Sequence, residues 1–206
     1  LDRLSGSLCD AVTAQEDGRG MLEALERGNL FVIPLDNQRQ WYRYHHLFAE
    51  VLQVNLKEAQ PEQISSLHKR ASAWYEQNGL QANAIRHALA AEDFERAAGL
   101  IELAWSAMDV SYQSSTWFGW VKELPDGLIR ARPVLSVGYA WALLDGGELE
   151  ASEARLHDAE HWLETPTNKM VVVDKEQFRS LPASIATARA YRSLALGDVP
   201  GTVKYA

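Results

Sequence analysis

The sequence predicts a mainly α-helical protein in which a truncated winged helix with one β-hairpin precedes a tetratricopeptide-like α-α superhelical array. Three observations lead to this prediction. Alternating or continuous apolar runs typical of strands occur near the start of the chain, within residues 30–45. From residue 61 onward, apolar side chains recur at the i, i+3, i+4 spacing of amphipathic helices. Short turns join these helices, as in stacked antiparallel helix pairs.

Residues 1–58 carry the order of elements expected of a winged helix that lacks its beginning. An amphipathic run opens the chain, and a short helix over 20–27 stops at Gly28. Apolar residues 30–35 and aromatic residues 41–45 predict two strands around a polar turn, and we expect strand structure in these two segments only. A further helix follows, with one amphipathic face formed by Leu47, Phe48, Val51, Leu52 and Leu56.

Residues 59–206 predict the helical array, which we expect to be incomplete at the C-terminus. The predicted helices span 62–78, 80–91, 94–110, 116–123, 134–144, 148–163 and 177–196. Gly79 and Gly146 each end a helix, and alanines five positions later open the next one. Small residues at such positions let paired helices approach closely, which is typical of tetratricopeptide-like repeats. We leave 165–175 as a loop.

Composition excludes several classes of function. The chain has 20 basic and 28 acidic residues, a formal net charge of −8, and residues 1–60 hold 6 basic and 9 acidic side chains. Such a surface is unfavourable for gripping a phosphate backbone, so we predict no direct DNA binding. Cys9 is the single cysteine, which excludes an internal disulfide and suggests a reducing compartment. With no apolar run of about 20 residues, we expect a cytoplasmic protein without a membrane span.

Three stretches of the chain resemble the large ATP-binding LuxR-type, or MalT-like, transcriptional regulators. Residues 1–52 are similar to the end of their winged helix, residues 67–102 to the start of their helical-repeat sensor region, and residues 120–156 to the stretch that follows. The resemblance implies a longer protein with a STAND-type ATPase, a winged helix, an inducer-binding repeat domain and a C-terminal helix-turn-helix. It also implies ATP or ADP bound to the ATPase domain, and self-association on activation.

The same resemblance singles out His45. STAND proteins carry a Met-His-Asp-type motif between the second strand of the wing and the next helix, and its His contacts the β-phosphate of ADP. The register places Tyr44, His45 and His46 on that motif, so His45 is the implied cofactor contact in the full-length protein. An imidazole N–H at a helix start suits a phosphate. The alternative is structural: His45 caps the helix or packs on Tyr42.

Two other patterns offer candidate sites. Residues 157–161 read His-Asp-Ala-Glu-His, a zinc-protease spacing, but a catalytic zinc needs a third ligand and the 45 residues that follow supply no matching motif. We therefore predict no metal site. Of the seven tryptophans, most fall at apolar helix positions that predict core packing. We take Trp117 as the exposed aromatic most suited to ligand binding.

These observations leave two functions open. The first is a non-catalytic regulatory hinge and inducer-sensor segment of a LuxR/MalT-type transcription activator, with the ATPase domain, the helix-turn-helix and a small-molecule inducer as partners. The second is a helical-repeat scaffold that binds a peptide or partner protein on its concave face. An enzyme is not predicted, because no nucleophile–base or paired-carboxylate arrangement stands out and no Gly-x-x-x-x-Gly-Lys-[Ser/Thr] loop occurs.

Overall fold

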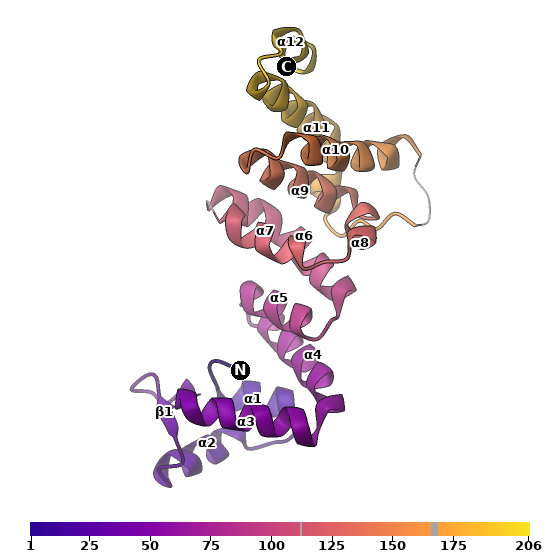
Figure 1. Cartoon of the computed structure of the whole chain (residues 1–206). Coiled ribbons are helices and arrows are strands. Elements are labelled where there is room, and N and C mark those ends of the chain that lie inside the picture. The colour runs from indigo at the N-terminus through magenta and orange to yellow at the C-terminus, as the bar shows by residue number, and fades with distance from the viewer. Residues whose placement is uncertain (112, 166–168) are drawn as a thin grey trace. The chain divides into compact units, whose positions relative to one another are not determined.

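The structure, a computed structural model, describes residues 1–111, 113–165 and 169–206, and its chain divides into two compact units. The first unit comprises Leu1–Asp93 and the second Phe94–Ala206. Helices dominate both units, and the described residues contain one two-stranded antiparallel sheet, which lies in the first unit (Figure 1). This is the predicted architecture of a winged-helix start followed by a helical array.

The first unit contains five helices and the sheet among its described residues. In chain order they are α1 (Gly6–Thr13), α2 (Gly18–Arg27), β1 (Val32–Pro34), β2 (Tyr42–Tyr44), α3 (His46–Ala59), α4 (Pro61–Gln77) and α5 (Gln81–Ala90). Both strands lie inside the predicted segments but are only three residues long. Phe31, directly before β1, has a positive φ of 60°, which interrupts the extended backbone there, and Arg39 has a φ of 53° within the turn between the strands.

The sheet and the first two helices enclose the core of the winged helix. Leu4, Leu22, Val32 and Tyr42 are buried together in it. Leu4 also pairs with Tyr42 through two backbone hydrogen bonds of 2.8 Å, so the residues before α1 add an isolated bridge to β2. The amphipathic run that opens the chain becomes helical only after Ser5, which is the N-cap of α1 and accepts a hydrogen bond from the amide of Leu8.

A single residue separates α3 from α4. Gln60 follows the last residue of α3 and precedes Pro61, the first residue of α4. Its φ and ψ of −144° and 52° are not helical, and its amide still donates to the carbonyl of Leu56. Proline suits the first position of a helix because its nitrogen has no hydrogen to satisfy. The chain therefore turns from one helix into the next at one position.

The pair formed by α4 and α5 is the first helical hairpin of the array. Gly79 adopts a φ of 71° in the connection, a conformation that favours glycine. The hydroxyl of Ser72 donates to the carbonyl of Ala84 across the hairpin at 2.8 Å, and both residues are fully buried. Small side chains at this crossing allow the close approach that the sequence predicts.

Helices are the only regular secondary structure among the described residues of the second unit. Its elements are α6 (Phe94–Val110), α7 (Ser114–Lys122), α8 (Asp126–Arg130), α9 (Pro133–Asp145), α10 (Leu149–Glu164), α11 (Lys175–Ala195) and α12 (Val199–Tyr205). The short helix α8 was not predicted. Its five residues lie between Pro125 and Pro133 and are too few to show a helical period.

Helix α9 forms the centre of this unit. Ten of its thirteen residues are buried, and it packs against α6, α7, α8, α10 and α11. Val137, Leu156 and Ile185, from α9, α10 and α11, belong to one apolar cluster. Gly138 is required on the side facing α6 and α7, because an added Cβ would lie 3.0 Å from the Trp117 ring. A glycine thus accommodates two tryptophans, Trp105 and Trp117, beside the central helix.

The segment between α10 and α11 falls in the predicted loop 165–175, of which residues 166–168 lie outside the described part. Glu102, a buried residue of α6, accepts hydrogen bonds from the amides of Val173 and Asp174 at 2.8 and 3.0 Å. Asp174 is in turn the N-cap of α11. The amide of Val171 donates to the carbonyl of Ala131, without forming a strand among the described residues. One carboxylate thus fixes this connection to α6.

Candidate functional site

His45 occupies the N-cap of α3, immediately after β2. Its amide donates to the carbonyl of Phe31 at 2.8 Å, which fixes the backbone against the start of the hairpin. Its side chain is exposed and forms no capping hydrogen bond within the described residues. The ring lies against that of His46, with centroids 4.6 Å apart, rather than against Tyr42. Two imidazoles are therefore presented to solvent at a helix start, where backbone amides add positive potential.

An apolar surface continues from these histidines along α3. Leu47, Val51 and Val54 expose 59%, 55% and 54% of their surface, and Phe31, which packs on Phe48, exposes 56%. The spacing of i, i+4 and i+7 places the three aliphatic residues on one side of the helix. No residue of α3, all of which is described, is buried. The amphipathic face predicted for this helix is present, but Leu47 and Val51 do not contribute to the core of the unit.

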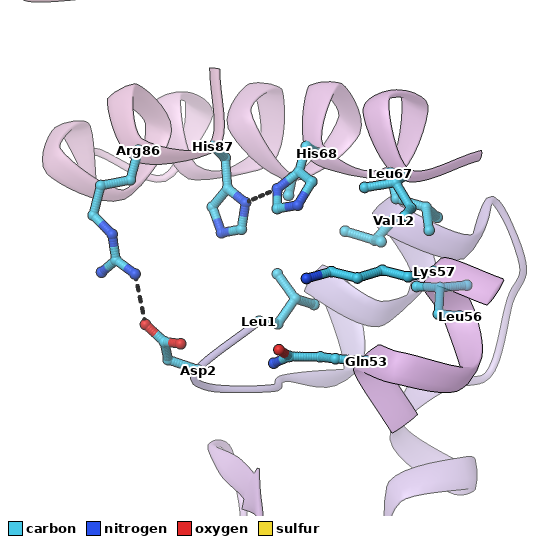
Figure 2. A pocket seen from close by; sticks show the side chains of 12 residues that line it. Leu1, Asp2, Val12, Gln53, Leu56, Lys57, Leu67, His68, Arg86 and His87 are labelled. Carbon is cyan, nitrogen blue, oxygen red and sulfur yellow. Dashed lines mark hydrogen bonds and ion pairs between the residues drawn. The ribbon is translucent and has the colours of Figure 1, made fainter. Parts of the chain in front are cut away.

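A cavity of about 410 Å³ lies in the first unit, between α3 and the hairpin α4–α5 (Figure 2). Its apolar wall is formed by side chains of α1, α3 and α4 together with Leu1. The members of this wall are Leu1, Val12, Leu56, Ile64, Leu67 and Ala71. The polar side chains come from three parts of the chain. They are Asp2 before α1, Gln53 and Lys57 of α3, and His68, Arg86 and His87 of α4 and α5. The cavity is thus amphipathic.

Two histidines form one edge of this cavity. The Nδ1 atoms of His68 on α4 and His87 on α5 lie 2.8 Å apart, so one ring donates its proton and the other accepts it. Burial lowers the pKa of His87 to about 4, with a further contribution from His68, and burial also lowers the pKa of His68. Tyr75 stacks on His87 at 5.2 Å. The pair is neutral at neutral pH.

The other polar groups of the cavity differ in how they are paired. Arg86 donates to Asp2 at 2.8 Å, and this hydrogen bond lowers the pKa of the Asp2 carboxyl. Lys57 and Gln53 extend from α3 and have no hydrogen-bond or ion-pair partner among the described residues (Figure 2). The side chains that line the cavity therefore include one ion pair, one neutral imidazole pair and one lysine without a partner among the described residues.

Neither histidine of this pair was predicted as a site residue. They are 19 residues apart, and each falls in a helix whose role is otherwise packing. The sequence spacing nonetheless contains a sign of this pair. Ser72 faces Ala84 across the hairpin, and His68 and His87 each lie one helical turn further from the connection between α4 and α5. To predict the pair, one must know which residues of α4 lie opposite which residues of α5, and the apolar periodicity of each helix does not give this register.

The prediction that Trp117 is exposed is wrong. Its side chain is fully buried, its Nε1 donates to the carbonyl of Ile101 at 2.8 Å, and its ring lies 4.5 Å from that of Trp105. Trp117 and Trp120 do share a face of α7, but that face is turned into the core of the second unit. The residue is a packing element with its single polar group satisfied.

The 157–161 motif does not assemble as a metal site. Glu160 pairs with Arg189 on α11 through contacts of 2.8 and 2.9 Å, while His157 and His161 are exposed beside Trp162. Among the described residues no cluster of three potential ligand side chains could hold a metal ion. None of the described helices is both long enough and apolar enough to cross a membrane.

Comparison with known proteins identifies the first part of the chain. The family described as the MalT winged helix domain matches residues 1–64. The serine/threonine-protein kinase PknK of Mycobacterium tuberculosis is 34% identical over 141 residues, which cover 68% of this chain and 13% of the kinase. The transcriptional regulator MalT of Vibrio campbellii is 32% identical over 143 residues, covering 68% of this chain and 16% of MalT.

A longer match comes from the MalT of Vibrio cholerae, which is 26% identical over 194 residues. It covers 90% of this chain and 21% of that regulator, so the chain spans a fifth or less of most of the relatives described. The matched winged helix contains the hairpin, His45 and the whole of α3. Residues 1–64 thus match the MalT winged helix domain, and the chain as a whole, in which helical pairs follow that domain, is similar to a segment of the MalT-like transcription regulators.

Proposed function

We propose that this chain is a regulatory hinge and inducer-sensor segment of a MalT-like transcription activator. Two features support the proposal. The MalT winged helix domain at residues 1–64 runs directly into helical pairs, and α3 is joined to α4 by the single residue Gln60. A winged helix so joined transmits its orientation to the first repeat. The segment itself is proposed to be non-catalytic, with binding of inducer to the repeats coupled to the nucleotide state of an ATPase domain.

The observation that carries this proposal is the presentation of His45. Its imidazole is exposed, forms no hydrogen bond among the described residues, and lies at the start of α3. These properties fit a donor to the β-phosphate of ADP, because an imidazole N–H and free helix amides both favour an anion. When bound to the ATPase domain, ADP supplies the phosphate charge that distinguishes the closed state. His45 would hold the winged helix against it.

The partners follow from the same proposal. They are the ATPase domain and the C-terminal helix-turn-helix of the same polypeptide, a small-molecule inducer, and further copies of the regulator on activation. We propose a cytoplasmic location, with DNA contacted by the helix-turn-helix rather than by this acidic segment, whose formal net charge is −8.

The test is transcription from a target promoter in the full-length regulator with His45→Ala, with His46→Ala and unchanged. A charge-assisted hydrogen bond is worth about 1.5–3 kcal/mol, so losing it shifts the closed-to-open ratio by about 10- to 150-fold. We expect inducer-free transcription in His45→Ala and little change in His46→Ala, the matched neighbour. If a folded His45→Ala protein shows unchanged inducer-free transcription, His45 does not hold the closed state and its role is structural.

A further inference from the structure

We propose that the cavity between α3 and the α4–α5 hairpin binds a small monocarboxylate with an apolar body. The site is distinct from His45, and the proposal does not depend on the role of that residue. Its volume of about 410 Å³ lies within the usual range of small-molecule sites, and half of its lining residues are apolar.

The charge of the ligand follows from the charges of the cavity. Asp2 and Arg86 neutralise each other through their ion pair. One hydrogen lies between the Nδ1 atoms of His68 and His87. Both rings are uncharged at neutral pH, since burial lowers both pKa values below that of an ordinary histidine. Lys57 is the one basic side chain of the lining without a partner among the described residues. Its ammonium group attracts a negative charge on the ligand.

The hydrogen-bond donors of the cavity indicate which headgroup the ligand carries. With both Nδ1 atoms engaged in the contact between the rings, one of the two Nε2 atoms carries a hydrogen and is free to donate. Gln53 adds an amide, and Lys57 adds an ammonium group that Figure 2 shows turned toward the space beneath the histidines. A carboxylate accepts from several donors through two oxygens. A phosphate dianion fits less well, because its second charge would be placed near the carboxylate of Asp2, which lines the same cavity.

The body of the ligand lies against the apolar wall. Val12 and Ala71 are buried, and Leu56 and Leu67 are half-buried, so an apolar chain placed there removes their remaining surface from water. Because Leu56 belongs to α3 and Leu67 to α4, such a ligand contacts both helices that meet at Gln60. Occupancy therefore favours one arrangement of the winged helix relative to the first helical pair.

The experiment uses the whole chain with octanoate as the probe, followed by calorimetry and by NMR of the histidine ring resonances. We expect saturable binding of octanoate, with shifts of the His68 and His87 resonances that give the same Kd. Acetate, which lacks the apolar body, and octan-1-ol, which lacks the charge, should both bind at least about tenfold more weakly.

Three lysine variants test whether octanoate binds at this cavity. Lys57→Gln removes the unpaired cation from an exposed position of α3 and should weaken octanoate binding about tenfold or more, whereas Lys57→Arg should retain it. Lys69→Gln is the matched control, because Lys69 lies on α4 outside the lining and pairs with Asp93. The proposal is overturned by an absence of saturable binding, by equal binding of octan-1-ol, by unmoved histidine resonances, or by equal losses in the two Gln variants.

Discussion

Glu102 on α6 and Arg132 after α8 form a buried ion pair in the second unit. Their side chains expose 0% and 5% of their surface, and Arg132 Nη1 lies 3.4 Å from Glu102 Oε2. The other oxygen of Glu102 accepts from the amides of Val173 and Asp174. Removing one partner of such a pair leaves an uncompensated charge in the interior, which is more harmful than removing an exposed ion pair.

We therefore expect Glu102→Ala to lower the free energy of unfolding by about 3–5 kcal/mol. The reason is that Arg132 keeps its contacts to Glu95 but loses its buried acceptor, and the amides of Val173 and Asp174 lose theirs at the same time. Urea titration measures the change, and hydrogen exchange at Val173 and Asp174 should accelerate. Glu95→Gln is the control, because the Glu95 side chain is 74% exposed and its contact with Arg132 should contribute less than about 1 kcal/mol. A Glu102→Ala protein as stable as Glu95→Gln would contradict this assignment.

Acid should destabilise the first unit through His87. Its pKa is about 4 in the folded chain against 6.5 for an ordinary histidine, so the unfolded chain binds the proton first as the pH falls. Stability is complete above about pH 6.5 and declines as the pH approaches 4. Thermal unfolding of the wild type and His87→Asn across this range should show a shallower pH dependence in the variant. His161→Asn, an exposed control, should keep the wild-type slope, and identical slopes in all three would refute the role of His87.

Gly138→Ala should destabilise the second unit. The new Cβ would approach Trp117 Cη2 to 3.0 Å and Trp105 Cδ2 to 3.2 Å, and overpacking of this kind costs about 1–3 kcal/mol. Near-ultraviolet circular dichroism should change as well, because two buried tryptophans must shift. Gly119→Ala provides the contrast: nothing lies within 4 Å of its Cβ, so alanine should stabilise α7 by up to about 1 kcal/mol. A neutral Gly138→Ala would show that the tryptophans yield without strain.

Arg189→Met should loosen the contact between α10 and α11. The guanidinium pairs with Glu153 and Glu160 of α10, with its side chain 14% exposed, and these hydrogen bonds lower the pKa of Glu160. We expect a loss of about 1–2 kcal/mol on urea unfolding, since the aliphatic part of the side chain is retained. Arg19→Met tests an exposed pair with Glu23 and should change stability by less than about 0.5 kcal/mol. Equal effects would mean that the Arg189 contacts contribute nothing beyond a surface pair.

The spacing of apolar and aromatic residues predicts the positions of the long helices and of the two strands. The helix over 94–110 was placed at its observed limits, and both strands fall inside their predicted segments. The short helix α8 and the bridge between Leu4 and Tyr42 were missed, because neither depends on a repeating pattern. Each arises from contacts with residues distant in the sequence.

The candidate sites were less predictable than the fold. The position of His45 at the start of α3 follows from the order of strand and helix. The burial of Trp117 does not, because whether one face of a short helix is covered depends on Gly138 and Trp105 in two other helices. The pair of His68 and His87 requires the register of a helical hairpin, which single-helix periodicity leaves undetermined.

Because only Gln60 connects α3 to α4, a rotation at this residue moves the whole of α3, and the displacement grows with distance from Gln60. Pro61 fixes its own φ, so a change of angle between α3 and α4 concentrates in the two dihedrals of Gln60. The 14 residues of α3 extend about 21 Å at 1.5 Å each, and His45 lies at the far end. A swing of about 10° at the joint therefore carries the two imidazoles through about 4 Å, more than the length of a hydrogen bond. A small rearrangement at the first helical pair would thereby become a displacement of several ångström at the other end of the helix.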